Sequence, residues 1–153
     1  MLLGSIAGLS LLLSSVIFAG GAYPLWQLPV LFLAWDLGLI LAAVLFLVIV
    51  CAAVDQEKPQ EEDSPFYRAI MHLYIEALIT FVGLRMHTEG LEKTPKEGRF
   101  LLVCNHQNES DPGILLHFFK KSQLAFISKK ENATMPFVGK FMHKTLCQMV
   151  NRE

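Results

Sequence analysis

The first third of the sequence has almost no charge. The chain of 153 residues contains 13 Lys and Arg and 14 Asp and Glu, yet between Met1 and Val54 the only acidic or basic side chain is Asp36. This deficit excludes an ordinary soluble domain for that stretch and is typical of a membrane anchor followed by a soluble module. Because a charge at mid-bilayer is costly, we expect the Asp36 carboxylate to pair between helices or to reach toward the headgroups.

Cysteines and excess basic charge are also scarce. Cys51, Cys104 and Cys147 are widely spaced and form no C-x-x-C pair, which excludes a disulfide framework and a zinc site, so we expect buried, reduced thiols. From Ser64 onward, twelve Lys and Arg accompany eight Asp and Glu, an excess too small for a nucleic-acid binder. We therefore expect a membrane surface or a phosphorylated lipid as partner, and no nucleic acid.

Two long apolar runs occupy the N-terminal region. Met1 to Ala22 and Leu28 to Val54 are each about long enough to cross ~30 Å of hydrocarbon as a helix. The break between them contains Gly, Pro, Tyr and Trp, which suit a turn at the headgroup level. We predict a transmembrane helical hairpin over residues 1–54, in preference to a signal peptide, because no basic segment precedes it. An acidic, solvated linker is expected over residues 55–64.

The remainder, residues 65–153, is predicted to be an α/β domain. A helix is expected from Ser64-Pro65, an N-cap and first-turn pair, to about Val82, because apolar residues recur there every three or four positions. Nearly continuous apolar strands, alternating with helices, predict a mostly covered sheet with at least some parallel strands. The strands are expected over residues 85–89, 100–104 and 124–128, and the further helices over residues 111–119 and 136–144.

A polar cluster follows the apolar run that ends at Cys104. Residues five apart on one continuous helix point ~140° away from each other, so His106 and Asp111 can meet only if a loop separates them. Asp111-Pro112 is typical of an N-cap and the first helical position, which would place the loop's end there. In that arrangement Asp111 would fix the imidazole tautomer, and His106 would take a proton from a substrate hydroxyl.

The segment Asn105-His106-x4-Asp111-Pro112 resembles the signature of the glycerophosphate and lysophosphatidate acyltransferase family, a group of glycerolipid acyltransferases. The uncharged N-terminal region is similar to that of Gram-positive members. Four further stretches look like family blocks in family order: Gly90-Leu91-Glu92-Lys93 with Pro95, Phe126 to Glu131, Met135 to Gly139, and Asn151-Arg152-Glu153.

The resemblance implies a bacterial inner-membrane enzyme of phospholipid biosynthesis, with its catalytic domain on the cytoplasmic side. Its reaction would transfer a fatty acyl group to the sn-2 hydroxyl of lysophosphatidic acid and yield phosphatidic acid. The donor would be an acyl carrier protein, coenzyme A or an acyl phosphate, and no metal or other cofactor is expected. The implied roles are general base for His106, orienting partner for Asp111, and substrate binding for Asn105, Lys129, Gly139 and Arg152, with Lys129 and Arg152 at the phosphate.

Two departures from the family pattern leave alternatives open. The chain has Asn151 where the family usually has Asp, and it stops before a third, Glu-Gly-Thr-Arg type block and a fourth, so we expect a domain truncated at its C-terminus. One alternative is a catalytically inactive, membrane-associated fragment or lipid-binding protein. Another is a serine lipase or esterase in which His106 serves Ser110 as nucleophile. No Gly-x-Ser-x-Gly elbow is present to favour an acyl-enzyme.

Overall fold

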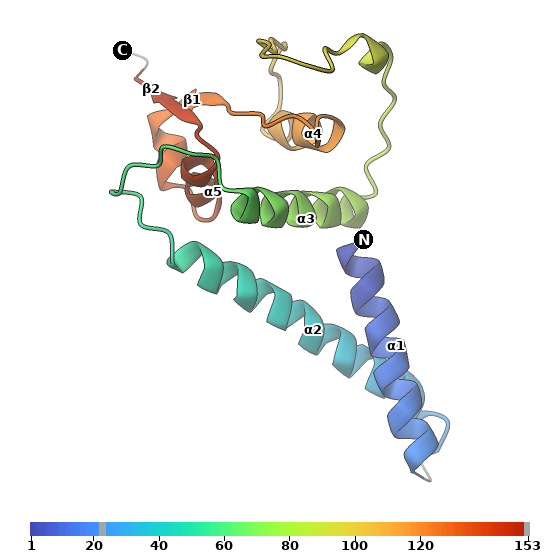
Figure 1. Ribbon diagram of the computed structural model, residues 1–153. Coiled ribbons are helices and arrows are strands. Elements are labelled where there is room, and N and C mark those ends of the chain that lie inside the picture. The colour runs from blue at the N-terminus through green and yellow to red at the C-terminus, as the bar shows by residue number, and fades with distance from the viewer. Residues whose placement is uncertain (22–23, 152–153) are drawn as a thin grey trace.

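A long helical hairpin supports a small mixed domain in the computed structural model, which describes residues 1–21 and 24–151 (Figure 1). The hairpin consists of α1 (Leu2–Gly20) and α2 (Gln27–Ala52), as predicted. Ser10 and Ser14 are fully buried, and small side chains of this kind let two helices approach closely. The Ser10 hydroxyl lies 3.4 Å from Oδ1 of Asp36, so this carboxylate is engaged between the helices, as predicted.

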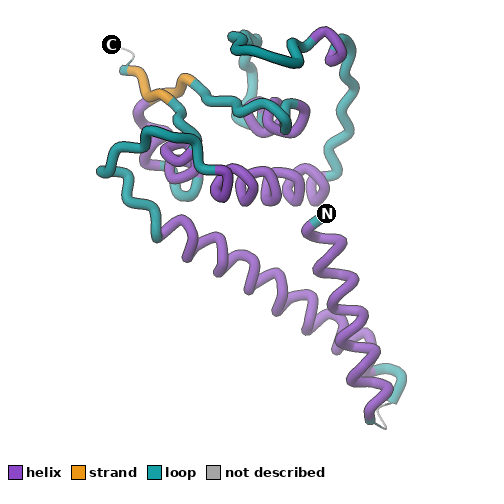
Figure 2. The backbone as a smooth tube through the Cα atoms, viewed as in Figure 1, coloured by secondary structure: helices purple, strands orange, loops and turns teal. Residues whose placement is uncertain are grey.

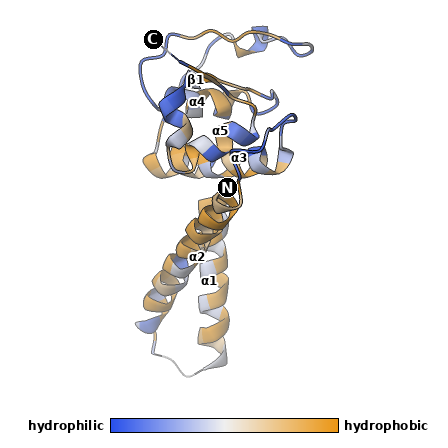
Figure 3. Cartoon of the chain, turned by 90° about the vertical axis from the view of Figure 1, so that its left-hand side faces the viewer, coloured by the Kyte–Doolittle hydropathy of each residue, from blue (hydrophilic) through white to orange (hydrophobic). Residues whose placement is uncertain are grey.

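The outer surface of the hairpin is apolar and uncovered. A row of four leucines and one isoleucine on α2 is more than half exposed, comprising Leu33, Leu37, Leu41, Leu45 and Ile49. Figure 3 shows hydrophobic colour along most of both helices and along the lower edge of the domain. Both helices are long and apolar enough to cross a membrane. A long row of exposed apolar side chains marks a protein or membrane contact, so the surface of the hairpin supports membrane association.

Helix α3 (Pro65–Val82) lies across the top of the hairpin and confirms the predicted helix. Ser64 occupies the N-cap position, and Gly83 ends the helix with φ +68°, a left-handed conformation that favours glycine. The hydroxyl of Tyr67 donates to the carbonyl of Val50 at 3.3 Å, and the hydroxyl of Tyr74 donates to the carbonyl of Ala43. Helix α3 is therefore joined directly to α2.

The linker between hairpin and domain is a loop in which most residues are exposed, as predicted for a solvated segment, and two of its groups also bond to the domain. The Lys140 ammonium donates to the carbonyl of Val54 at 3.0 Å, and the Lys144 ammonium donates to the Gln60 side chain at 2.7 Å. Both lysines belong to α5 (Val138–Lys144). The linker is therefore exposed to solvent, as its acidic composition suggested, and hydrogen bonds from this helix also hold it against the domain.

The domain combines helices with a small parallel sheet, which agrees with the predicted α/β class. Strands β1 (Ile127–Lys129) and β2 (Gln148–Val150) are parallel, with Ile127 opposite Gln148 and Lys129 opposite Val150. Figure 2 shows that these strands are short and that loops occupy much of the upper domain. The remaining elements are α4 (Asp111–Phe118) and two 3-10 turns, η1 (Leu91–Lys93) and η2 (Lys130–Thr134).

The strands predicted over residues 85–89 and 100–104 are absent, because both stretches lie in loops. A strand is stabilised by hydrogen bonds to a neighbouring strand, and neither stretch has such a neighbour within residues 1–21 and 24–151. Leu101 and Val103 are consequently 83% and 80% exposed. The sequence pattern correctly indicated an apolar run. Whether a strand forms depends on a pairing partner, which local sequence does not specify.

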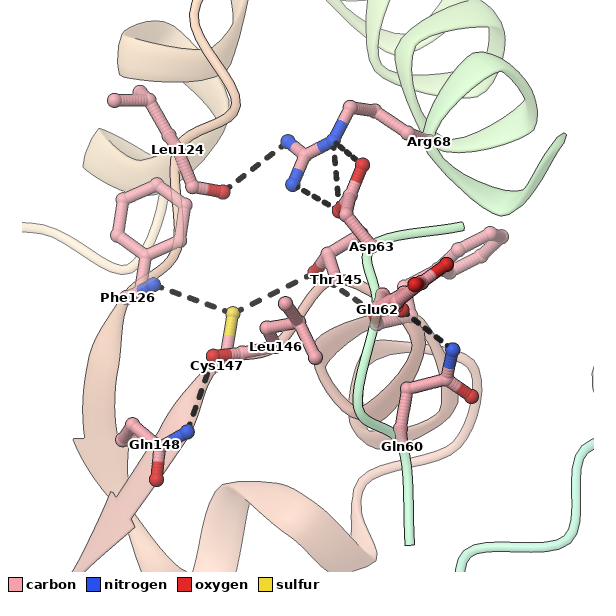
Figure 4. Close-up of polar contacts among 11 residues, drawn as sticks. Gln60, Glu62, Asp63, Arg68, Leu124, Phe126, Thr145, Leu146, Cys147 and Gln148 are labelled. Carbon is pink, nitrogen blue, oxygen red and sulfur yellow. Dashed lines mark hydrogen bonds and ion pairs between the residues drawn. The ribbon is translucent and has the colours of Figure 1, made fainter. Parts of the chain in front are cut away.

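A buried ion pair connects α3 with the segment that leads into β1 (Figure 4). The Arg68 guanidinium donates from Nε and Nη2 to the Asp63 carboxylate at 2.5–3.0 Å, and from Nη1 to the carbonyl of Leu124 at 3.1 Å. Next to it, the backbone N–H of Phe126 points at the Cys147 sulfur, 3.3 Å away. These contacts fix the linker, α3 and both strands relative to one another.

Candidate functional site

The predicted dyad forms at a loop-to-helix junction. Nδ1 of His106 lies 3.0 Å from Oδ2 of Asp111, and residues 105–110 form the intervening loop that the spacing required. Asp111 is the first residue of α4, and Ser110 occupies the N-cap position, one residue earlier than predicted. The geometry explains the shift, because the Asp111 carboxylate faces back into the loop instead of capping the helix's own amides.

The same carboxylate oxygen organises the loop. Oδ2 of Asp111 accepts hydrogen bonds from the backbone N–H of Gln107 at 2.8 Å and of Asn108 at 2.9 Å. These two amides, first Asn108 and then Gln107, together with the His106 ring, hold the pKa of Asp111 below its ordinary 3.8. Asp111 is therefore ionised at neutral pH, and one carboxylate positions both the backbone and the imidazole.

The orientation of the ring leaves a base available. A carboxylate only accepts hydrogen bonds, so a neutral His106 donates from Nδ1 to Asp111 and keeps the lone pair on Nε2. The His106 side chain is 59% exposed and that of Asp111 is 25% exposed. An incoming hydroxyl can therefore reach Nε2, while Asp111 stabilises the imidazolium that forms after proton transfer.

The Ser110 hydroxyl does not take part in this arrangement. Within the part of the chain that the structure describes, this hydroxyl makes no hydrogen bond. The backbone N–H of Ser110 donates to Oδ1 of Asn108 at 3.1 Å. The nitrogen of His106 that faces the protein is engaged by Asp111. A serine nucleophile requires a hydrogen bond to its base, so this geometry gives no support to the lipase or esterase alternative.

A cavity of about 210 Å³ adjoins the dyad. Cys104 and Asn105 line it from the loop, and Asp111, Ile114 and Leu115 line it from α4. Asn105, predicted to bind substrate, therefore lies beside the dyad. Cys104 is exposed, contrary to the prediction of a buried thiol, because its segment pairs with no strand in the described residues.

A second, larger cavity of about 470 Å³ lies at the carboxyl ends of the two parallel strands. Lys129, the last residue of β1, lines it together with Glu131, Asn132 and Val150. The ends of parallel strands are where α/β proteins commonly bind ligands, so a cation here is placed to meet an anionic group. The structure thus assigns Lys129 and the dyad to different cavities. Arg152, the other predicted phosphate contact, lies outside the described residues.

Gly139 is buried in α5 and packs against η2. A Cβ atom at this position would lie 2.0 Å from the carbonyl oxygen of Ala133, far inside van der Waals contact. The Gln56 side chain in the linker donates to the same carbonyl at 3.1 Å. Glycine is therefore required here for close packing, and its predicted part in substrate binding stays a prediction.

Sequence reasoning missed a charged cluster that supports α4. Nδ1 of His117 lies 2.6 Å from Oε1 of Glu76 on α3, and the Lys120 ammonium lies 2.9 Å from the same oxygen. Burial raises the pKa of Glu76, but hydrogen bonds from Lys120 and His117 outweigh it and leave the pKa below 4.5. The only signal in the sequence was Glu76 on the polar side of a periodic helix, which does not identify a partner.

His72 lies one helical turn before Glu76, and among the residues that the structure describes neither of its buried ring nitrogens has a hydrogen-bond partner. Burial lowers its pKa, and the nearby Arg68 and Lys120 cations lower it further. A neutral imidazole is therefore favoured at this position. No group of three or more His, Cys, Asp and Glu side chains suited to a metal ion occurs within residues 1–21 and 24–151.

Residues 85–153 match the family model described as Acyltransferase. The matched segment contains His106, Asp111 and all residues that line the two cavities. This segment is therefore similar to acyltransferase domains, and the similarity supports a general acyl-transfer function. No curated protein and no solved structure matches the chain.

Proposed function

We propose that the acyltransferase domain transfers a fatty acyl group to the sn-2 hydroxyl of lysophosphatidic acid at a membrane surface. The observation that carries this proposal is the 3.0 Å contact between His106 Nδ1 and Asp111 Oδ2 within the matched segment. This contact leaves Nε2 of His106 free to act as a base on an alcohol. A general base with no protein nucleophile beside it acts directly on the hydroxyl of an alcohol acceptor.

The proposed reaction is a direct transfer. Nε2 of His106 takes the proton of the acceptor hydroxyl as its oxygen attacks the carbonyl carbon of the donor. The new ester bond forms as the bond from that carbon to the leaving group breaks, and the leaving group departs as thiolate or phosphate. The proton on His106 then passes to the leaving group or to water, which restores the neutral imidazole.

The Lys129 ammonium is the feature that supports a phosphorylated acceptor. A phosphomonoester carries close to two negative charges at neutral pH, and Lys and Arg hold such groups through charge-assisted hydrogen bonds. Lys129 lines the larger cavity together with Asn132, a polar neighbour, and with Glu131, whose carboxylate offsets the lysine charge. We propose that Lys129, with Arg152, binds the acceptor phosphate, and that Asn105 and Gly139 complete the substrate-binding residues.

The apolar hairpin supports a membrane location for this reaction. Lysophosphatidic acid and its acylated product both reside in a bilayer, so an enzyme anchored in that bilayer encounters its acceptor by diffusion within the membrane plane. We propose that the hairpin anchors the chain in the bacterial inner membrane, with the domain on the cytoplasmic side where acyl carrier protein, coenzyme A and acyl phosphate donors would be supplied.

Acyl transfer in lipid nanodiscs tests the proposal. Radiolabelled palmitoyl donors of each type are supplied with lysophosphatidic acid, and labelled phosphatidic acid is measured. We expect His106→Ala to lower turnover by about 10²–10⁴-fold, the usual contribution of a positioned general base. His87→Ala is the matched control, since this exposed imidazole lies in a loop and lines neither cavity. Normal turnover in His106→Ala would contradict the proposal.

The same preparation separates the alternatives. A folded chain that neither binds nor acylates lysophosphatidic acid would support an inactive membrane-associated protein. Labelling of Ser110 by a fluorophosphonate probe would support a serine esterase, whereas general-base acyl transfer predicts no labelling there.

A further inference from the structure

Helix α3 carries apolar side chains that the domain leaves uncovered. Five of them are exposed, comprising Phe66, Leu73, Leu78, Phe81 and Val82. The charged side chains of this helix are engaged elsewhere. Arg68 is buried in its ion pair with Asp63, and Glu76 bonds to His117 and Lys120 on the side of α4. The exposed part of α3 is therefore uncharged and open to a partner outside the domain.

Two hydrogen bonds set the level of α3 along the hairpin. Tyr67 donates to the carbonyl of Val50, near the end of α2, and Tyr74 donates to the carbonyl of Ala43, seven residues earlier. Seven residues of helix correspond to about 10 Å. Helix α3 consequently lies beside the last turns of α2 and not above its end.

Those last turns of α2 are apolar and exposed as well, at Leu45, Val48 and Ile49. A hydrocarbon layer of ~30 Å takes up about 20 residues of a helix, whereas α2 has 26. In a bilayer the end of α2 therefore reaches the boundary between the acyl chains and the headgroups. Because α3 is bonded to this part of α2, it lies at the same boundary.

We propose that the exposed face of α3 inserts into the boundary between acyl chains and headgroups of the bilayer that holds the hairpin. Helices in this position bury their apolar face by about 5–10 Å. Figure 1 shows α3 lying across the hairpin, and the hydrophobic lower edge of the domain in Figure 3 continues the apolar surface of α1 and α2. The inference concerns how the domain is seated and does not depend on the acyl donor or acceptor.

Apolar contact, and not charge, is the basis of this insertion. The linker directly before α3 exposes Glu57, Glu61 and Glu62, whose carboxylates are repelled by anionic headgroups. The neighbouring cations Lys140 and Lys144 are engaged in hydrogen bonds to the linker. We therefore expect α3 to insert into a bilayer of neutral phosphatidylcholine that contains no anionic lipid.

Fluorescence of single tryptophans in liposomes tests the inference on the full chain. The native Trp26 and Trp35 are replaced by Phe, and Phe81→Trp is introduced as the reporter because this side chain is 80% exposed. The liposomes contain phosphatidylcholine with bromine near the upper or the lower end of the acyl chains, which quenches only nearby tryptophan. Leu101→Trp is the matched control, since Leu101 is 83% exposed but belongs to the loop between η1 and α4, away from the hairpin (Figures 1 and 3).

We expect upper-chain bromine to quench Phe81→Trp at least about twofold and lower-chain bromine to quench it less, because an in-plane helix inserts only about 5–10 Å. Leu78→Trp, a second exposed position of α3, should give the same result. Leu101→Trp should stay unquenched. A chain that retains Trp35 is expected to show the reverse order, because this residue lies well inside the span of α2.

Two outcomes would overturn the inference directly. If Trp35 is quenched but neither Phe81→Trp nor Leu78→Trp is, the hairpin lies in the bilayer and α3 faces water or another protein. If Leu101→Trp is quenched as strongly as Phe81→Trp, the domain contacts lipid without a preferred face. Quenching that appears only after phosphatidylglycerol is added would contradict the apolar basis of the contact.

These measurements need no turnover, so they separate the inference from the proposed function. A quenched Phe81→Trp in a chain that transfers no acyl group would support the seating of α3 and contradict the reaction. Acyl transfer that depends on His106, together with an unquenched Phe81→Trp, would support the reaction and overturn the seating. An unquenched Trp35 would remove the hairpin from the bilayer and overturn the inference with it.

Discussion

Oε1 of Glu76 on α3 accepts a hydrogen bond from Nδ1 of His117 at 2.6 Å, and this contact fastens the helix that begins with Asp111. Lys120 reinforces it from 2.9 Å. Helix α4 has eight residues and loops on both sides, and its main packing partner is α3. The position of Asp111, and through it that of His106, therefore depends on a carboxylate more than thirty residues earlier in the chain.

Replacing Glu76 is expected to loosen the loop that carries the dyad. In Glu76→Gln the neutral amide holds His117 and Lys120 less firmly, so the Gln107 and Asn108 amides should exchange with deuterium faster. Hydrogen exchange measured on peptides that cover residues 105–110 checks this. Glu92→Gln, in η1, is the matched control. Unchanged exchange in Glu76→Gln would show that apolar packing alone positions α4.

The same carboxylate gives a defined pH dependence. The pKa of Glu76 is lowered in the folded chain, so its contribution to stability is present above the ordinary value of 4.5 and is lost as the pH falls through the lower, folded pKa. We expect thermal stability in nanodiscs to decline below about pH 4.5, and Glu76→Gln to remove part of that decline. An identical pH profile for the variant would contradict this assignment.

Breaking the buried pair between Arg68 and Asp63 is expected to be strongly destabilising. Arg68→Ala leaves the Asp63 carboxylate buried, and removal of one partner from such a pair typically costs about 3–5 kcal/mol. Thermal unfolding in detergent measures the loss. The double variant Arg68→Met with Asp63→Leu removes both charges and should recover much of the stability. Equal losses in the single and double variants would argue against the ion pair as the cause.

Asp111→Asn separates the orienting role of this residue from simple loop structure. The amide oxygen can still accept the Gln107 and Asn108 N–H groups, but the side chain no longer stabilises the imidazolium. We expect acyl transfer to fall by about 10²-fold or more, while amide exchange over residues 105–110 changes little. A large rise in exchange together with the lost activity would indicate a structural role instead.

Gly139→Ala distinguishes packing from substrate contact at this position. The added Cβ would overlap the Ala133 carbonyl, so α5 or η2 has to move, and we expect a clear loss of thermal stability. Gly113→Ala, where a Cβ meets nothing within 4 Å, is the control. If Gly139→Ala raises KM for lysophosphatidic acid while the unfolding temperature stays unchanged, the residue contacts substrate.

Local pattern predicted the long elements well. The hairpin and α3 are each specified by an extended apolar pattern with Gly, Pro or Ser at its ends, and these features act within a few residues of each other. The dyad was predicted chiefly from the resemblance of Asn105-His106-x4-Asp111-Pro112 and its flanking blocks to a family signature. Helix geometry added only that a loop must separate His106 from Asp111.

Features that depend on distant partners were not predictable. Strand formation by residues 100–104 requires a neighbour that the segment itself cannot specify, whereas β2 is three residues long and shows no recognisable pattern. The bonds from Glu76 to His117 and from Arg68 to Leu124 join residues 41 and 56 positions apart. Such contacts arise only after the chain has folded, so composition and spacing carried no sign of them.

The linker described above has a mechanical consequence. Hydrogen bonds from Lys140 and Lys144 fasten it to α5, while Tyr67 and Tyr74 fasten α3 to α2. Two independent attachments prevent the domain from swivelling about a single tether. The dyad is consequently held at one height and one orientation relative to the hairpin. Under the proposed function, lipid substrates would have to adjust their depth and tilt to it.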